Sequence, residues 1–244
     1  MREQDVVAPC LGVVMPCFDE RGTVEIIIER VLASPYVQQL VVVDDGSTDG
    51  TREVVEKIAT TDGRVTVVTH GTNRGKGAAL RNGFAAVTAP YVVVQDADLE
   101  YDPVEYGVLL EPLFNERADV VYGSRFVGSG AHRVLYFWHS VGNKLLTLAS
   151  NIFTDLNLSD METCYKAFRR EVLESFTIEE RRFGVEAEIT AKVATGGWRV
   201  YEVGISYNGR TYAEGKKIDW RDGAIAMWCI VKYGWRGRRH RARS

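Results

Sequence analysis

Short apolar runs that alternate with amphipathic stretches dominate the first half of the chain. Residues 41–43 and 91–94 are such runs, each too short for a helix and each followed by polar residues. Between such runs, apolar residues recur at a helical period, as Val54, Val55 and Ile58 do. This alternation is typical of strand–helix–strand units with parallel strands. We therefore expect an α/β domain with a Rossmann-like, mostly parallel sheet and helices on both faces.

The expected elements continue to the end of the chain without a linker, so we predict a single domain. The expected strands cover residues 11–16, 40–44, 65–69, 91–95, 120–123, 164–168 and 198–206. Helical patterns begin at Thr23 and cover residues 54–59, 78–87, 133–153, 185–194 and 220–235. If the sheet begins in the order 3-2-1-4, the loop at 17–20 lies beside the end of the fourth strand.

Two of the apolar runs end in paired acids. Asp96 and Asp98 follow the strand at 91–95, and Asp44 and Asp45 follow the strand at 40–44. In an open parallel sheet, ligands bind outside the carboxyl ends of the strands. Carboxylate oxygens there suit Mg²⁺ or Mn²⁺, which take further ligands from substrate phosphates. The pattern thus indicates an enzyme that binds a nucleotide diphosphate, although an Asp-x-Asp sequence alone could be a solvated acidic turn.

Composition excludes several other classes of function. The 244-residue chain has a net charge of −3, which argues against a protein that binds nucleic acid over its whole surface. Its four cysteines match no zinc spacing, and its four histidines form no pair four residues apart. We expect reduced thiols and a cytoplasmic protein, because no signal peptide and no membrane-spanning stretch is recognisable.

Several motifs together resemble the family 2 glycosyltransferases, in particular the polyprenyl-phosphate sugar synthases related to dolichyl-phosphate mannose synthase. The motifs are Val-Val-Met-Pro-Cys-Phe-Asp-Glu at 13–20, Val-Asp-Asp-Gly-Ser-Thr-Asp-Gly-Thr at 43–51, Asn-Arg-Gly-Lys-Gly at 73–77, Asp-Ala-Asp at 96–98, Gly-Ser-Arg-Phe at 123–126 and the loop at 210–217. The resemblance implies a GT-A fold with a nucleotide-sugar half (1–130), an acceptor half (131–235) and a basic tail (236–244).

The resemblance also implies the roles of particular residues on the donor side. Asp96, Asp98 and Glu100 would hold Mg²⁺ or Mn²⁺, with Asp98 essential for catalysis and Ala97 contacting substrate. Asp44 would bind the nucleotide base, beside Asp45, whereas the turn that follows is equally explained as helix capping. The remaining donor-side residues are Pro16, Phe18 and Glu20 around the ribose and base, and Lys76 near the diphosphate, where a plain surface lysine is the alternative. Phe18 departs from relatives, which often carry Tyr or Asn there.

On the acceptor side, the resemblance assigns Arg125, Arg210, Lys216 and Lys217 to a lipid phosphate or to closure over the diphosphate. A solvated basic loop is the alternative for one of the lysines. A lipid phosphate is largely dianionic at neutral pH, so it needs no strong base. Asp160 is the candidate base if the acceptor is an alcohol. Glu162 and Glu188 are expected to serve structural roles.

Two segments suggest a membrane surface as a partner. The stretch 133–153 carries aromatic and leucine side chains on more than one face, and residues 232–244 carry six Lys or Arg and no acid. An apolar helix with a polybasic end is typical of peripheral binding to anionic lipid, here at the cytoplasmic face. A core helix followed by a disordered tail is the alternative.

The sequence as a whole predicts a metal-dependent, inverting transfer from a nucleotide sugar to a polyprenyl phosphate. A UDP-sugar is preferred as donor, with GDP-mannose second, and a separate integral membrane protein is a further potential partner. Three alternatives are open: a family 2 enzyme acting on a glycan or small hydroxylated acceptor, a nucleotidyltransferase, and a non-catalytic nucleotide-binding relative.

Overall fold

The computed structural model describes residues 8–128, 134, 136–210 and 220–241 as one α/β domain with a central seven-stranded sheet. The strands are β1 (Leu11–Cys17), β2 (Val37–Asp44), β3 (Val65–Thr69), β4 (Tyr91–Val94), β5 (Val120–Ser124), β6 (Lys166–Arg169) and β7 (Val200–Gly204). Their order in the sheet is β3-β2-β1-β4-β6-β5-β7. The predicted start, 3-2-1-4, is therefore confirmed.

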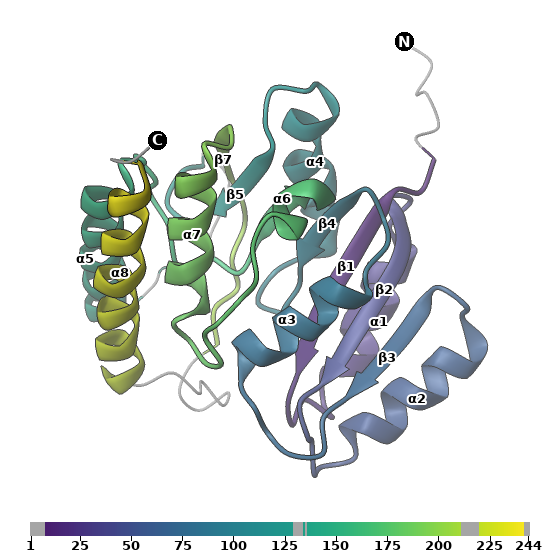
Figure 1. Cartoon of the computed structure of the whole chain (residues 1–244). Helices are drawn as coiled ribbons and strands as arrows, with labels where there is room; N and C mark the ends of the chain where they lie inside the picture. The colour runs from purple at the N-terminus through teal and green to yellow at the C-terminus, as the bar shows by residue number, and fades with distance from the viewer. Residues whose placement is uncertain (1–7, 129–133, 135, 211–219, 242–244) are drawn as a thin grey trace.

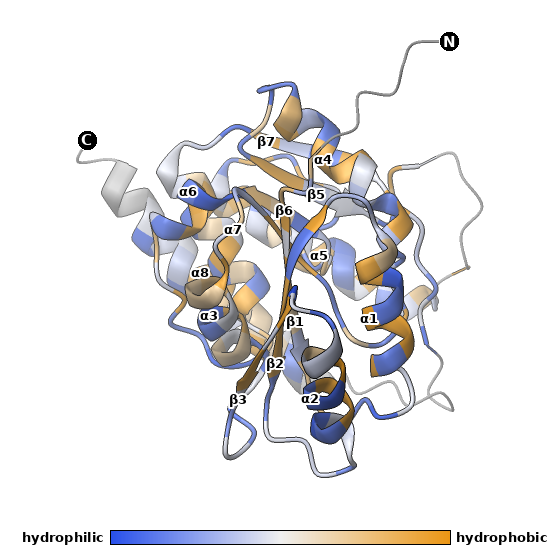
Figure 2. Cartoon of the chain, turned by 90° about the vertical axis from the view of Figure 1, so that its right-hand side faces the viewer, coloured by the Kyte–Doolittle hydropathy of each residue, from blue (hydrophilic) through white to orange (hydrophobic). Residues whose placement is uncertain are grey.

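Helices cover both faces of the sheet, as Figures 1 and 2 show, with α1 and α2 on one side and α3 on the other. The helices are α1 (Val24–Ala33), α2 (Thr51–Thr61), α3 (Lys76–Ala86), α4 (Tyr106–Phe114), α5 (Phe137–Thr154), α6 (Arg170–Glu174), α7 (Val185–Gly196) and α8 (Trp220–Arg241). A short 3-10 helix, η1 (Pro103–Glu105), precedes α4. Strands β1 and β2 are buried almost throughout, because both of their faces are covered.

Strand β6 runs in the opposite direction to its two neighbours in the sheet. It pairs antiparallel with both β4 and β5, whereas β5 and β7 pair in parallel. The residues that precede β6 therefore lie at the same edge of the sheet as the residues that follow β4 and β5. The Asp-Ala-Asp motif, which follows β4, lies at this edge.

Three local predictions differ from the structure. The helical pattern expected from Thr23 begins one residue later as α1, and the Thr23 hydroxyl instead donates to the carbonyl of Ala97 at 2.8 Å. Helix α4 was not predicted, and it contains Pro112, a residue that normally disfavours the interior of a helix. Helix α8 continues to Arg241, so most of the segment expected as a basic tail is helical.

Candidate functional site

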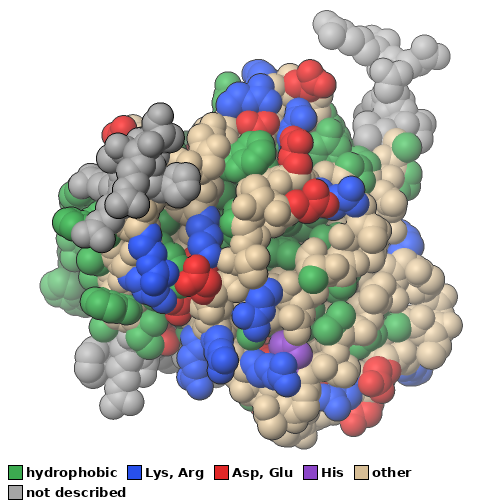
Figure 3. Space-filling view, viewed as in Figure 1, with side chains coloured by type: hydrophobic (Ala, Val, Ile, Leu, Met, Phe, Trp, Pro, Cys, Tyr) green, Lys and Arg blue, Asp and Glu red, His purple; other side chains and the backbone are tan. Residues whose placement is uncertain are grey.

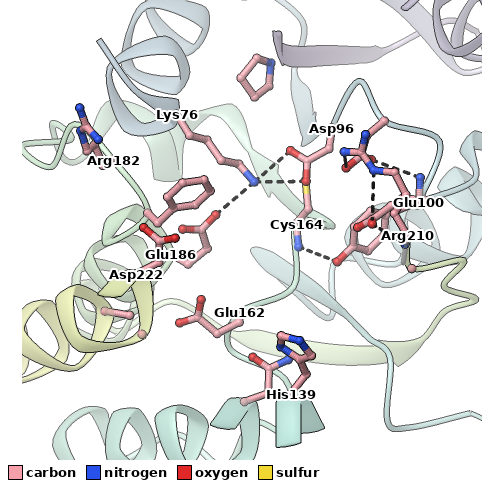
Figure 4. Close-up of a pocket in the computed structure, with 18 of the residues that line it drawn as sticks. Lys76, Asp96, Glu100, His139, Glu162, Cys164, Arg182, Glu186, Arg210 and Asp222 are labelled. Atoms are coloured by element: carbon pink, nitrogen blue, oxygen red, sulfur yellow. Dashed lines mark hydrogen bonds and ion pairs between the residues drawn. The ribbon is translucent and has the colours of Figure 1, made fainter. Parts of the chain in front are cut away.

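A cavity of about 1260 Å³ lies at the edge of the sheet where β1 and β4 end. Residues from both the amino-terminal and the carboxy-terminal half of the chain line it. The predicted residues in its wall are Pro16, Phe18, Glu20, Asp45, Lys76, Asp96, Ala97, Asp98, Glu100, Arg125 and Arg210. Figure 4 shows several of them converging from the surrounding elements.

Buried hydrogen bonds fix the start of the Asp-Ala-Asp motif. Gln95 is fully buried, and its amide oxygen accepts hydrogen bonds from the hydroxyls of Tyr106 and Tyr165, each at 2.7 Å. Its amide nitrogen donates to the carbonyl of Asp96 at 3.1 Å. Gln95 therefore holds the acidic motif against the sheet, a role that no sequence signal indicated.

Each acid of the motif has its own cation. Lys76 lies 2.9 Å from Asp96, and Arg210 lies 2.7 Å from Asp98. Lys76 lowers the pKa of Asp96 against the opposing effect of burial. Burial and the charges of Asp96 and Glu100 raise the pKa of Asp98 to about 7, although Arg210 opposes them. The pKa values of the two carboxylates are thus shifted in opposite directions.

The donor set fits a divalent cation. Asp96 and Asp98 line one cavity, and their carboxylate oxygens are the hard ligands that a divalent cation such as Mg²⁺ or Mn²⁺ prefers. Within the described ranges, no group of three or more His, Cys, Asp and Glu side chains is already gathered so that it could hold a metal ion. In this arrangement Arg210 provides the positive charge beside Asp98.

Glu100, predicted as a third metal ligand, ties the acceptor half to the acidic motif. Its carboxylate accepts hydrogen bonds from the backbone N–H of Arg210 at 2.7 Å and from the hydroxyl of Tyr207 at 2.8 Å. The chain reaches Glu100 through a left-handed turn at Leu99, where φ is +64°. With its oxygens engaged in this way, Glu100 positions Arg210, which also lies 3.3 Å from Glu20.

The two acids after β2 face different surroundings. Asp44 is fully buried, forms an ion pair with Arg52 at 2.8 Å and is not part of the cavity wall. Asp45 lines the cavity, and its carboxylate accepts hydrogen bonds from the backbone N–H groups of Arg74 at 2.9 Å and Gly75 at 2.7 Å. Of the two acids, only Asp45 therefore faces the cavity.

The glycines of the 73–77 motif serve the packing of the chain. Gly75 has a φ of +93°, and a Cβ there would lie 2.3 Å from the carbonyl oxygen of Arg181. A Cβ on Gly77 would lie 2.3 Å from the carbonyl oxygen of Glu180. Both positions therefore need glycine because another part of the backbone approaches them closely.

Arg125 and Asp160 form a bidentate ion pair. The Nε and Nη2 atoms of Arg125 lie 2.6 and 2.7 Å from the two carboxylate oxygens of Asp160. Asp160 is fully buried and outside the cavity wall, whereas Arg125 lines the cavity and packs on Tyr207. This geometry suits Asp160 to orienting Arg125 more than to taking a proton. Lys216 and Lys217 lie outside the described residues.

Two glutamates of the acceptor half have contrasting environments. Glu188 accepts hydrogen bonds from the backbone N–H groups of Glu179 and Glu180, each at 2.7 Å, which is the structural role expected of it. Glu162, for which a structural role was also expected, instead lines the cavity. Glu186 joins it there, and the sequence gave no separate signal for Glu186.

An exposed apolar surface lies beside this site on α5 and α8, which pack against each other (Figures 1 and 3). Trp138 is 78% exposed and Trp228 is 66% exposed. The other large apolar side chains exposed there are Phe137, Leu145, Leu148, Ile152, Ile225, Met227, Val231 and Trp235. None of the helices, over their described residues, is long and apolar enough to cross a bilayer.

Comparison with known proteins identifies the family to which the chain belongs. The family model described as Glycosyl transferase family 2 matches residues 12–177. The chain is 32% identical to the polyprenol monophosphomannose synthase of Mycolicibacterium smegmatis over 95% of its own length and 89% of that protein. It is also 32% identical to the glycosyltransferase AglJ of Haloferax volcanii, over 87% of this chain and 68% of that one.

Solved structures with the same fold include glucosyl-3-phosphoglycerate synthase from Mycobacterium tuberculosis. Its complex with Mn²⁺, UDP and phosphoglyceric acid superposes with a TM-score of 0.71 and 22% identity, over 93% of this chain and 78% of that one. A complex of the same enzyme with Mg²⁺ and UDP gives a TM-score of 0.70. These likenesses confirm the predicted GT-A fold.

Proposed function

Since this chain belongs to glycosyl transferase family 2, we propose that it transfers a sugar from a nucleotide sugar to a polyprenyl phosphate. The observation that carries the proposal is the convergence of Asp96 and Asp98 with Arg125 and Arg210 in one cavity. The acids suit a metal-bound diphosphate, and the arginines suit the oxygens of a second phosphate. The identity to a polyprenol monophosphomannose synthase, which covers nearly the whole chain, supports the same acceptor.

In this proposal the two halves of the chain bind different substrates. Residues 1–130 bind the donor, with Asp45 facing the nucleoside and Lys76 beside the diphosphate. Residues 131–235 bind the acceptor together with Arg125, which Asp160 holds in place. Arg210, which Glu100 positions, connects the two halves through its ion pair with Asp98. A UDP-sugar is the first donor to test, because solved structures with the same fold hold UDP. GDP-mannose is the second, because mannose is named in the mycobacterial relative.

The chemistry proposed is a single displacement with inversion. A bound Mg²⁺ or Mn²⁺, held by Asp96 and Asp98, would stabilise negative charge on the departing nucleoside diphosphate. An oxygen of the lipid phosphate attacks the anomeric carbon while the bond from that carbon to the diphosphate breaks. Arg125 orients the attacking phosphate, and no proton needs to be removed from a dianion.

We further propose that the enzyme works as a peripheral protein on the cytoplasmic face of a membrane. The apolar faces of α5 and α8 lie beside the cavity, and Trp138 and Trp228 have the amphipathic rings that favour a lipid interface. A prenyl chain that remains in the bilayer could then present its phosphate to Arg125 without leaving the membrane.

The test is a transfer assay with radiolabelled UDP- and GDP-sugars, a short-chain prenyl phosphate, and Mn²⁺ or a chelator. Label that enters an organic extract in the presence of Mn²⁺ supports the proposal. Label on a water-soluble glycan would favour the hydroxyl-acceptor alternative, and pyrophosphate release from a nucleoside triphosphate would favour a nucleotidyltransferase. Nucleotide binding without transfer to any acceptor would indicate a non-catalytic relative.

A further inference from the structure

A buried histidine contacts the acid of β2 that faces the cavity. His70, which follows β3, is only 3% exposed and lies outside the cavity wall. Its Nδ1 lies 2.5 Å from Oδ1 of Asp45, and its Nε2 lies 2.8 Å from the amide nitrogen of Asn82 on α3. Its backbone is fixed as well, because its N–H donates to the carbonyl of Asp44 at 2.8 Å. The imidazole therefore has a defined position between an acid of the cavity and a side chain outside it.

The contact with Asn82 determines which ring nitrogen of His70 carries the proton. An amide nitrogen can only donate, so the N–H of Asn82 requires a bare Nε2 as its acceptor. The ring proton is then on Nδ1, from which it is donated to Asp45. The two hydrogen bonds thus run in one direction, from Asn82 through His70 to Asp45. His70 presents a donor, and not an acceptor, to the carboxylate.

The donors around Asp45 leave one acceptor position open. Oδ1 of this carboxylate accepts from His70 and from the backbone N–H of Arg74, and Oδ2 accepts from the backbone N–H of Gly75. A carboxylate has about four lone-pair positions. Among the residues that the structure describes, no donor occupies the fourth position, which belongs to Oδ2. Since Asp45 lines the cavity, that position is available to a donor on a ligand.

The place of Asp45 in the sheet relates this acceptor to a nucleotide. β1 lies between β2 and β4, so the ends of β2 and β4 are roughly 10 Å apart. With a diphosphate at Asp96, the ribose would lie over the end of β1, where Pro16 and Phe18 line the cavity. The base would then reach Asp45. Uracil and guanine have a ring N–H that suits a carboxylate acceptor, whereas cytosine and adenine have a bare nitrogen at that position of the ring.

We infer that His70 is a positioning residue for recognition of the base. It holds the carboxylate of Asp45 so that the open position of Oδ2 accepts the ring N–H of uracil or guanine. This inference rests on the proposed function, and it adds a residue that selects the donor substrate without contacting it. Sites built to accept a substrate N–H reject analogues that lack it, because the buried polar group is then left without a partner. Without the bond from His70, Oδ1 also has an open position, and the carboxylate no longer presents a single acceptor to the base.

The test measures how strongly the protein distinguishes bases that have the ring N–H from bases that lack it. Calorimetry in Mn²⁺ compares UDP with CDP and GDP with ADP, since each pair keeps the ring size and the diphosphate. The native protein should bind UDP or GDP at least about tenfold more tightly than the other member of the pair. His70→Leu should lower this ratio to less than about threefold, because the hydrogen bond to Asp45 is lost.

Two amide variants separate positioning from a merely structural role of His70. His70→Asn should restore most of the ratio, because its amide can donate to Asp45 from near the place of Nδ1. His70→Gln should not, because its longer side chain carries the amide to the place of Nε2. Thr154→Val is the matched control, since Thr154 is also buried and loses a hydrogen bond to the carbonyl of Ser150, but lies outside the cavity wall. This control should keep the native ratio.

A second measurement uses the native protein and does not depend on the folding of a variant. Nitrogen-15 NMR of the histidine rings should show His70 with a proton on Nδ1 and a bare Nε2, and a proton on Nε2 would overturn the inference. Equal binding of both members of each pair by the native protein, an unchanged ratio in His70→Leu, or equal ratios in the Asn and Gln variants would also overturn it and leave the proposed transfer in place. A native protein that binds none of the four nucleotides would overturn the proposed transfer as well.

Discussion

The acidic motif after β4 shows how neighbouring carboxylates acquire different properties. Asp96 faces Lys76, and its pKa is lowered. Asp98 is surrounded by Asp96 and Glu100 as well as Arg210, and its pKa is raised to about 7. The sequence predicted that both acids reach the cavity, because their position at a strand end is a local property. It did not predict their partners, since Arg210 is 112 residues from Asp98 along the chain.

Asp98→Ala should reduce transfer by at least about 100-fold, the usual loss when a preorganised stabilising group is removed from a catalytic site. The fold should persist, because Asp98 lies in a loop and not in the sheet. Turnover is measured with the donor identified in the transfer assay, and circular dichroism checks the fold. Glu56→Ala, a change at an exposed acid of α2, should leave turnover unchanged. Undiminished turnover in Asp98→Ala would refute a metal-binding role.

Glu162 should make the stability of the protein depend on pH. Its pKa is raised from 4.5 to about 8 in the folded chain, so between these values the folded state binds more protons than the unfolded state. The free energy of unfolding therefore falls as pH rises through this window, by up to about 1.4 kcal/mol per pH unit. Thermal unfolding of Glu162→Gln should show a smaller fall between pH 5 and 8. Parallel curves for the two proteins would contradict the shift.

At the scale of elements, all seven strands lie near their predicted positions, but only the order of the first four in the sheet was predicted. β1 to β4 follow the alternation of apolar runs and helical stretches, a pattern that can be recognised within short segments of the sequence. The insertion of β6 between β4 and β5 depends on contacts such as the pairing of Val93 with Ala167, which no local pattern encodes. The Arg125–Asp160 ion pair was missed for the same reason.

Helices α5 and α8 were expected from their periodicity, and their exposed faces bear on the membrane proposal. Trp138→Glu and Trp228→Glu should each weaken binding to anionic vesicles on the order of tenfold, because each removes a large apolar side chain from the interface. Sedimentation with vesicles measures this loss. Val104→Glu is the control, since Val104 is 81% exposed but lies on η1, apart from these helices. If all three variants bind vesicles equally, another surface contacts the lipid.

For the whole molecule, the cavity formed by both halves implies that ligands stabilise the fold. UDP or GDP with Mn²⁺ at about 100 times its dissociation constant should add about 2.7 kcal/mol to the free energy of unfolding. The melting temperature should rise accordingly, and a chelator should remove most of the rise. Asp98→Ala should show only the part of the rise in melting temperature that does not depend on metal. A rise that is unaffected by the chelator would contradict metal binding at this site.

The direction of β6 has a consequence for how such enzymes diversify. The stretch just ahead of this strand contributes Glu162 and Cys164 to the cavity wall, and it begins at the exposed Asp155 that follows α5. Exchange of residues 155–159 and 161–164 between homologous chains, with Asp160 and Tyr165 kept to hold Arg125 and Gln95, would therefore change one wall of the cavity and leave strands β1 to β4 in place. Chimeras built across that stretch offer a route to transferases with redesigned selectivity.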